Sequence, residues 1–233
     1  MNDSAASLHA CIESLWLHLR CLQRAGLKFD ALAAQSGQTA CALAPGEQLA
    51  ALRSETADCR RCRLCSARTH VIFGEGSARA RLMFVGSAPD RASDAQGRPF
   101  AGESGELLTR IIEAIGLQRS QVYLTDAVKC LAPQQDDPGD DAGEACFPIL
   151  KRQIEIIQPD IICALGPAAA RTFREQASGA GPARGQFHRA GTMLVMPTHH
   201  PELLLRRPEL KRETWIDVQR IQRELESAPL RER

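Results

Sequence analysis

The sequence predicts an α/β protein with three layers, α/β/α, around a central, mostly parallel four-stranded sheet. Two observations carry this prediction. Short apolar runs bounded by turn residues recur along the chain, as expected for strands buried on both faces of a parallel sheet. Segments with the spacing of amphipathic helices separate these runs, an alternation typical of doubly wound domains. The four runs are Arg81–Gly86, Gln121–Asp126, Asp160–Leu165 and Thr192–Pro197.

The first element expected along the chain is a helix over residues 4–25. Its apolar residues recur at spacings of four and three, which places one stripe along a helix; they are Leu8, Ile12, Leu15, Leu19 and Leu22. This stripe either binds a protein partner or packs against its own domain, and the sequence leaves both readings open. Residues 31–50, rich in Ala, Gln and Gly, are expected to form a linker. We therefore divide the chain into a helical extension with its linker, residues 1–50, and an α/β domain, residues 51–233.

Within the α/β domain, helices are expected over residues 105–115, 146–157, 167–175 and 208–225. Pro167 suits a first helical turn, because the N–H that proline lacks would have no intrahelical partner there. Ligands of such sheets bind beyond the carboxyl ends of the strands. Three segments at strand ends are therefore candidate binding loops, namely residues 86–89, 125–126 and 198–201.

Composition excludes several classes of protein. A hydrophobic fraction of 44% and a charged fraction of 24% over 233 residues are typical of a soluble globular protein. No apolar run approaches the length of a membrane span, and the N-terminus lacks the pattern of a secretory signal. Nine cysteines without an export signal indicate a reducing compartment, so we expect a cytoplasmic protein. The net charge of +1 means that any nucleic-acid contact must depend on local cations.

Four of the nine cysteines have the spacing of a metal site. Cys59 and Cys62 form a C-x-x-C pair, and Cys130 and Cys146 form a second pair far along the chain. Two such pairs, contributed by distant loops, are typical of four-thiolate sites. Thiolates suit zinc and iron–sulfur clusters alike, and spacing does not choose between them. Cys65 is a spare thiol close to the first pair.

The cysteines and the strand-end segments together resemble the family 4 (iron–sulfur) uracil-DNA glycosylases. The resemblance runs from about Cys59 to Leu225 and agrees in both order and spacing. Its motifs are Cys59-x-x-Cys62, Phe73-Gly74-Glu75-Gly76, Gly86-x-Ala88-Pro89, Gln96-Gly97-Arg98-Pro99-Phe100, Thr125-x-x-Val128-Lys129-Cys130, Cys146 and His200-Pro201-x-x-Leu204-Leu205-Arg206. It implies the uracil-DNA glycosylase fold for residues 51–233 and excision of uracil, or a related deaminated base, from DNA by a monomer. It also implies a [4Fe–4S] cluster on Cys59, Cys62, Cys130 and Cys146 that is mainly architectural.

The resemblance also assigns roles to residues around a base pocket. A glycosylase extrudes the target base and holds it in a closed pocket, and Phe100 occupies the family's stacking position. His200 is the candidate catalytic residue, a donor that stabilises the charge developing on the pyrimidine O2. The expected pocket residues are Ser87, Ala88, Phe100, Asp126 and His200. Leu204, Arg206 and Arg207 are expected to contact DNA as an apolar wedge and phosphate-binding cations; the alternative is an ordinary helix start with exposed arginines.

Three departures from the family pattern fall in this pocket. Ser87 and Ser93 stand where the family has acidic residues, so assistance to catalysis would have to come from Ser87 itself or from Asp90. Asp126 replaces the asparagine that reads uracil. An ionised Asp126 has acceptors only, whereas a protonated Asp126 imitates the amide, and a carboxyl group also suits the amino group of cytosine. Two functions therefore remain open: a DNA glycosylase, and a weakly active or non-catalytic DNA-binding relative of the family.

Overall fold

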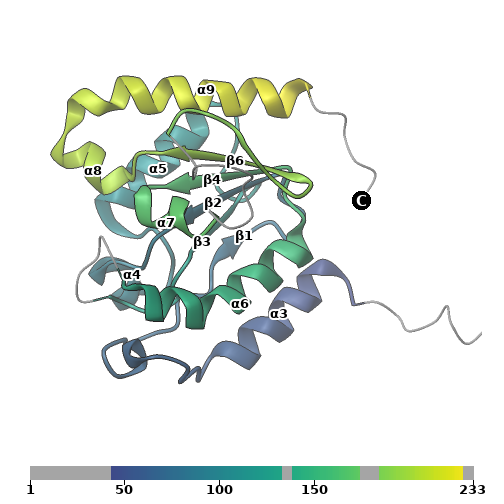
Figure 1. Ribbon diagram of the computed structural model, residues 1–233, viewed down its shortest axis with the longest axis vertical. Coiled ribbons are helices and arrows are strands. Elements are labelled where there is room, and N and C mark those ends of the chain that lie inside the picture. The colour runs from purple at the N-terminus through teal and green to yellow at the C-terminus, as the bar shows by residue number, and fades with distance from the viewer. Residues whose placement is uncertain (1–42, 133–137, 174–183, 228–233) are drawn as a thin grey trace, which may run out of the picture. The chain divides into compact units, whose positions relative to one another are not determined.

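The computed structural model describes residues 43–132, 138–173 and 184–227, and from Ala44 onward they belong to one compact unit. Its centre is a six-stranded sheet with the strand order β1-β3-β2-β4-β6-β5 (Figure 1). The strands are β1 Glu75–Gly76, β2 Leu82–Gly86, β3 Tyr123–Asp126, β4 Ile161–Leu165, β5 His188–Ala190 and β6 Met193–Thr198. The four inner strands are parallel to one another, as the sequence predicts.

The prediction of four strands is incomplete, because an antiparallel strand borders the sheet on each side. β1 pairs with β3, and β5 pairs with β6. These edge strands are only two and three residues long. Strands of that length are too short to show an alternating pattern of apolar residues in the sequence, and short edges are one way in which proteins limit unwanted strand pairing.

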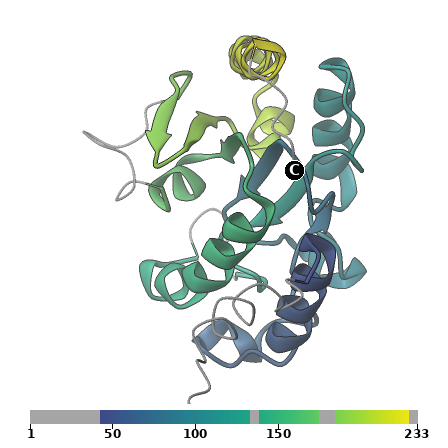
Figure 2. The same cartoon turned by 90° about the vertical axis from the view of Figure 1, so that its right-hand side faces the viewer.

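Helices cover both faces of the sheet and complete the expected three layers. α3 (Pro45–Thr56), α6 (Asp140–Ile157) and α7 (Pro167–Arg171) lie on one face, and α5 (Gly102–Ala114) and α9 (Lys211–Ser227) lie on the other (Figures 1 and 2). Each face has its own apolar core. β2 illustrates the division, because Met83 and Val85 belong to the first core while Leu82 and Phe84 belong to the second. Successive side chains of a strand point to opposite faces, so a strand buried on both faces reads as an unbroken apolar run.

The chain order of the parallel strands creates a crevice at their carboxyl ends. After β2 the chain places β3 on one side of it and then β4 and β6 on the other. Connections that leave in opposite directions open a gap between them, and in open α/β sheets ligands bind at that switch point. Two short helices border this end of the sheet, α4 (Arg91–Gln96) after β2 and α8 (Pro201–Arg206) after β6.

The predicted helices are present, but their bounds differ from those expected: α7 begins at Pro167 as expected and ends earlier, at Arg171, and the other three begin at other residues. α5 begins three residues earlier, at Gly102, and α6 begins at Asp140 and continues through Pro148. A 3₁₀ turn, Pro208–Leu210, precedes α9. The linker expected over residues 31–50 is wrong for residues 45–50, because these form the start of α3, where Leu49 is buried. The helix expected over residues 4–25 lies outside the described residues, and no described helix is long and apolar enough to span a membrane.

Candidate active site

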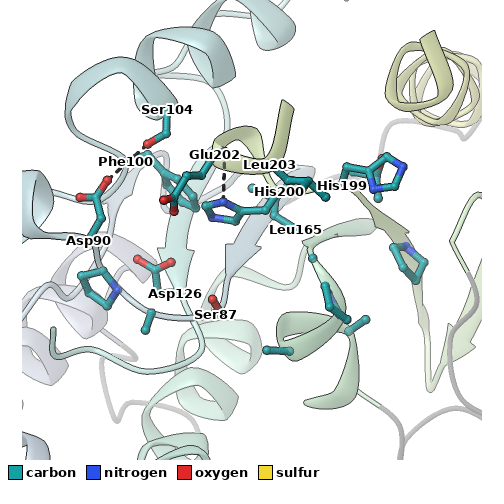
Figure 3. Close-up of a pocket in the computed structure, with 18 of the residues that line it drawn as sticks. Ser87, Asp90, Phe100, Ser104, Asp126, Leu165, His199, His200, Glu202 and Leu203 are labelled. Carbon is teal, nitrogen blue, oxygen red and sulfur yellow. Dashed lines mark hydrogen bonds between the residues drawn. The ribbon is translucent and has the colours of Figure 1, made fainter. Parts of the chain in front are cut away.

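A pocket of about 500 Å³ lies at the carboxyl ends of the parallel strands. The loops after β2, β4 and β6 and the end of β3 contribute to its lining (Figure 3). All five residues that the sequence assigns to the base pocket line it, namely Ser87, Ala88, Phe100, Asp126 and His200. The strand-end segments singled out in the sequence therefore meet at one concave site.

Phe100 forms a rigid wall of this pocket. Its backbone has φ = 48°, a conformation rare for a residue with a side chain, and the residue is 6% exposed. The backbone of Gly105 packs directly on it, because a Cβ at Gly105 would lie 1.6 Å from the Phe100 carbonyl oxygen. Arg119 donates from Nη2 to the carbonyl oxygens of Pro99, at 2.6 Å, and Phe100, at 3.3 Å. The ring packs in the apolar core and also lines the pocket. It can therefore offer a fixed face to a flat ligand.

His200 lies opposite, with its ring centroid 6.1 Å from that of Phe100. It is the N-cap of α8, and its Nδ1 accepts the backbone N–H of Glu202 at 3.3 Å. A ring nitrogen that accepts a hydrogen bond carries no hydrogen, so in the neutral imidazole the hydrogen is on Nε2. The cap therefore sets the tautomer that makes Nε2 a donor.

The residues before His200 are braced by α9. The Thr198 hydroxyl donates to the Asp217 carboxylate at 2.8 Å, and Asp217 is 2% exposed. His199 lies 3.0 Å from the Glu213 carboxylate through its Nε2. These contacts fix the loop that carries His200 and give His199, to which the sequence assigned no role, a bracing one.

Asp126 closes the pocket at the end of β3. It is 2% exposed, and a Cβ at Gly86 would lie 2.2 Å from its Oδ1, so only glycine fits beside the carboxyl group. Burial raises the pKa of Asp126 to about 7, the nearby Lys129 ammonium opposes this shift, and the Asp90 carboxylate adds to it. A substantial fraction of the Asp126 carboxyl groups therefore keeps its proton near neutral pH.

The Lys129 ammonium is buried close to Asp126, and each of its three N–H bonds has an acceptor. Nζ donates to Thr125 Oγ1 at 2.6 Å, to the carbonyl oxygen of Asp126 at 2.6 Å and to Gln153 Oε1 at 2.7 Å. Burial lowers the pKa of Lys129, but three acceptors for three N–H bonds favour the charged form. The bond from Lys129 Nζ to the carbonyl oxygen of Asp126 holds the backbone of Asp126 in place.

The acidic side chains near the substituted family positions already have partners. Asp90 caps α4, accepting the Ser93 N–H on Oδ1 at 2.7 Å and the Ser104 hydroxyl on Oδ2 at 3.4 Å. Asp94 is buried away from the pocket and accepts the backbone N–H groups of residues 69 and 70. The Ser93 hydroxyl is buried and accepts the N–H of Ala101. Of this segment, Asp90 alone offers a carboxylate to the pocket.

The expected DNA contacts on α8 need one correction. Leu204 is 1% exposed and faces the interior, so it cannot act as a wedge in this conformation, whereas its neighbour Leu203 lines the pocket. A helix exposes one side, so adjacent leucines point in different directions, and the motif does not reveal which one is outside. Arg206 and Arg207 are exposed and pair with Glu202 and Glu209 respectively.

Cys59, Cys62, Cys130 and Cys146 all line one small pocket beside α6, which Cys65 does not line. Two N–H groups already point at their sulfurs: Arg68 Nη1 is 3.4 Å from Cys130 Sγ, and the Lys129 backbone nitrogen is 3.4 Å from Cys146 Sγ. Burial raises the pKa of Cys130 to about 11 and also raises that of Cys146. Within the described ranges, no three metal-binding side chains stand close enough together to hold a single ion. The four thiols thus surround a common space without forming a ready-made site for one ion.

The arginines around this pocket differ in role. Arg63 is tied to Asp141 at 3.0 Å and to the carbonyl oxygen of Pro138 at 3.0 Å, so it fastens the first cysteine loop to the start of α6. Together with Arg68, it serves the cysteine loops. Arg60 and Arg61 of the same loop are exposed, and Arg61 also lines the cysteine pocket.

Sequence reasoning missed three polar residues that line the pocket, Ser104, Arg184 and Glu202. Glu202 follows His200 by two positions, where a side chain at the start of a helix can return to the same pocket as the cap residue. Its place in the pocket depends on the N-cap at His200, so no pattern of residue types in the sequence identifies it.

Comparison with known proteins identifies the family that this fold and pocket define. Residues 73–219, more than half of the chain, match the family model described as the uracil DNA glycosylase superfamily. The chain belongs to this superfamily.

Among individual relatives, the type-4 uracil-DNA glycosylase of Sulfurisphaera tokodaii is 39% identical over 194 residues, covering 79% of this chain and 88% of that protein. Type-4 uracil-DNA glycosylases of Saccharolobus solfataricus and Thermotoga maritima are 36% and 39% identical, covering 79% and 70% of this chain and 89% and 86% of those proteins.

Proposed function

We propose that this protein is a DNA glycosylase that removes uracil from DNA by hydrolysing the bond between the base and the deoxyribose. The observation that carries the proposal is the meeting, in one pocket, of a buried aromatic ring, a buried carboxyl group and an imidazole N–H donor. The relatives named type-4 uracil-DNA glycosylases support the choice of substrate.

In the proposed complex, an extruded uracil lies against the Phe100 ring. Asp126 reads the edge of the base in its protonated form, in which the carbonyl oxygen accepts the N3–H and the hydroxyl donates to O4. The ionised form offers only acceptors and repels O4. Recognition of uracil therefore requires the proton that burial retains on Asp126.

His200 supplies the electrostatic part of the proposed reaction. When the N-glycosidic bond breaks, its electron pair stays with the base, and negative charge develops on the pyrimidine oxygens. The neutral His200 imidazole donates its Nε2–H to O2, where a donor preorganised for that charge stabilises the transition state. The cap on Nδ1 keeps this hydrogen on Nε2 throughout.

We also propose that Cys59, Cys62, Cys130 and Cys146 hold a [4Fe–4S] cluster. A cluster is wider than a single ion, so four thiols spread around one small pocket suit it, and the N–H groups of Arg68 and Lys129 suit anionic sulfur ligands. The four cysteines would hold the cluster, which would supply a cross-link between the loops that carry them. Leu203, Arg206 and Arg207 are the proposed DNA contacts, through the apolar gap left by the base and through phosphates.

Asp126 favours a second candidate substrate. A protonated carboxyl group can exchange the roles of its two oxygens, so that its hydroxyl donates to the cytosine N3 and its carbonyl accepts the exocyclic amino group. Cytosine, most readily extruded from a mismatch, is therefore a candidate beside uracil.

A cleavage assay tests the proposal. Oligonucleotides that carry a single uracil, hypoxanthine or mismatched cytosine are incubated with excess protein at pH 6, and the abasic product is cleaved with alkali and quantified. We expect release of uracil, with at most slower release of the other bases. No release from any of the three would contradict a glycosylase function.

A further inference from the structure

Hydrolysis of an N-glycosidic bond needs a negative charge near the sugar as well as a donor at the base. The sugar carbon becomes cationic as the bond breaks, and the attacking water must lose a proton. The family's acidic positions in this pocket are Ser87 and Ser93 here. A neutral hydroxyl group supplies neither the charge nor a strong proton acceptor, so the carboxylate must come from elsewhere or be absent.

Three carboxyl groups line the described pocket, those of Asp90, Asp126 and Glu202. Asp126 lies with the base-reading groups and needs its proton for that task. Asp90 uses one oxygen to cap α4 and the other to accept the Ser104 hydroxyl. Both oxygens of Asp90 thus already accept hydrogen bonds that hold two helices in place, whereas Glu202 has an oxygen without such a bond from any residue that the structure describes.

Glu202 reaches the pocket from the first turn of α8, two residues after His200. Its side chain is 23% exposed, and Figure 3 shows the carboxylate directed into the pocket that also holds His200, Asp90 and Asp126. Oε1 accepts a hydrogen bond from Arg206. Among the described residues no donor reaches Oε2, so this oxygen is available to a ligand or a water molecule in the pocket.

We propose that Glu202 is a catalytic residue, the carboxylate that takes over the role of the missing acids at positions 87 and 93. This inference rests on the proposed glycosylase function. In the step assigned to it, the bond between the base nitrogen and the sugar carbon breaks, and its electron pair leaves with the base. A water oxygen bonds to the sugar carbon, the water proton passes to Glu202 Oε2, and that proton later returns to solvent or to the base anion. Arg206 holds the other oxygen and keeps the carboxylate in place.

The location of Glu202 agrees with this role. The N-cap bond of His200 runs to the backbone N–H of Glu202, so the base-side donor and the sugar-side carboxylate are built on one helical turn and keep a fixed separation.

The first experiment compares single-turnover excision of uracil by wild type, Glu202→Gln and Glu202→Asp. Glu202→Gln should be slower by about 100-fold, within the range for loss of a general base, whereas Glu202→Asp should recover part of the rate. Affinity for the uracil-containing duplex should stay equal or rise, because Arg206 is released to bind phosphate. Glu209→Gln is the matched control: it breaks the equivalent pair with Arg207 outside the pocket and should excise at the wild-type rate.

The second experiment adds Ser87→Glu to Glu202→Gln. Restoring a carboxylate at the family position should raise the rate of the Glu202→Gln variant at least tenfold. Wild-type excision combined with an unaffected Glu202→Gln variant would overturn the role of Glu202 and leave the glycosylase function intact. A wild-type protein that excises none of the three bases would overturn both proposals.

Discussion

The two pockets of this protein contrast in how closely they keep to the family pattern. The cysteine pocket retains all four expected thiols around one space, with N–H groups directed at two of the sulfurs. The base pocket brings together Phe100 and His200, which match the family pattern that the sequence resembles, with Ser87, Ser93 and Asp126, which depart from it.

Lys129 shows how these regions are joined. Its backbone N–H points at Cys146, and its ammonium holds the backbone of Asp126. A change in one pocket can therefore reach the other through a single buried residue. We therefore expect changes in the cysteine pocket to affect mainly folding and changes in the base pocket to affect mainly activity.

The largest expected effect concerns the cysteine pocket. Cys130→Ser and Cys146→Ser each remove a buried thiol, and we expect loss of bound iron and of most soluble protein, because metal binding and folding are coupled in such sites. Cys65→Ser is the control, since Cys65 does not line the pocket, and it should keep iron and solubility. Iron content and soluble yield measure the outcome. A soluble Cys146→Ser protein with a full complement of iron would remove the contrast between the two pockets.

A smaller effect is expected at His200, where chemistry but not folding should suffer. His200→Ala removes the donor at O2 and should slow uracil excision by about 100- to 1,000-fold, as for the loss of an oxyanion-stabilising donor. Thermal denaturation should show a folded protein. His199→Ala, which removes the hydrogen bond to Glu213 and leaves the His200 imidazole in place, should have the smaller effect on the rate. Equal losses in both variants would mean that the loop as a whole, and not the His200 imidazole, supports catalysis.

Much of the fold and of the pocket could be predicted from the sequence, and the features that could not be predicted have physical causes. The inner strands are predictable because residues such as Phe84 and Ile162, buried from both faces, make unbroken apolar runs. The edge strands β1 and β5 are too short to leave a pattern. The motif points to Leu204 rather than Leu203 because residue types do not reveal which side of a short helix is buried. Glu202 escapes prediction because a helix cap brings it into the pocket, and a pattern of residue types does not encode that tertiary feature.

The smallest expected effect concerns DNA affinity. Reversing charge in Arg206→Glu with Arg207→Glu should weaken binding to all DNA sequences alike. The slope of log affinity against log salt concentration should become shallower by about one for each phosphate that the protein no longer neutralises. Both arginines already pair with neighbouring carboxylates, so the decrease in affinity should be modest. Arg223→Glu, near the far end of α9, is the control. Fluorescence anisotropy at several salt concentrations gives the measurement, and an unchanged slope would place the phosphate-binding residues elsewhere.

The central claim is that a protonated Asp126 now reads the base, and the pH dependence of uracil excision tests it most directly. Its pKa is raised from 3.8 to about 7, so the carboxyl group keeps its proton below that pH and loses it above. Single-turnover excision by wild type should therefore be constant below about pH 6 and fall about tenfold per pH unit well above pH 7. Asp126→Asn carries a permanent N–H donor and should remove this decline and exceed the wild-type rate at about pH 8. A wild-type rate that is flat from about pH 5 to about pH 9, with Asp126→Asn no faster at any pH, would contradict the account.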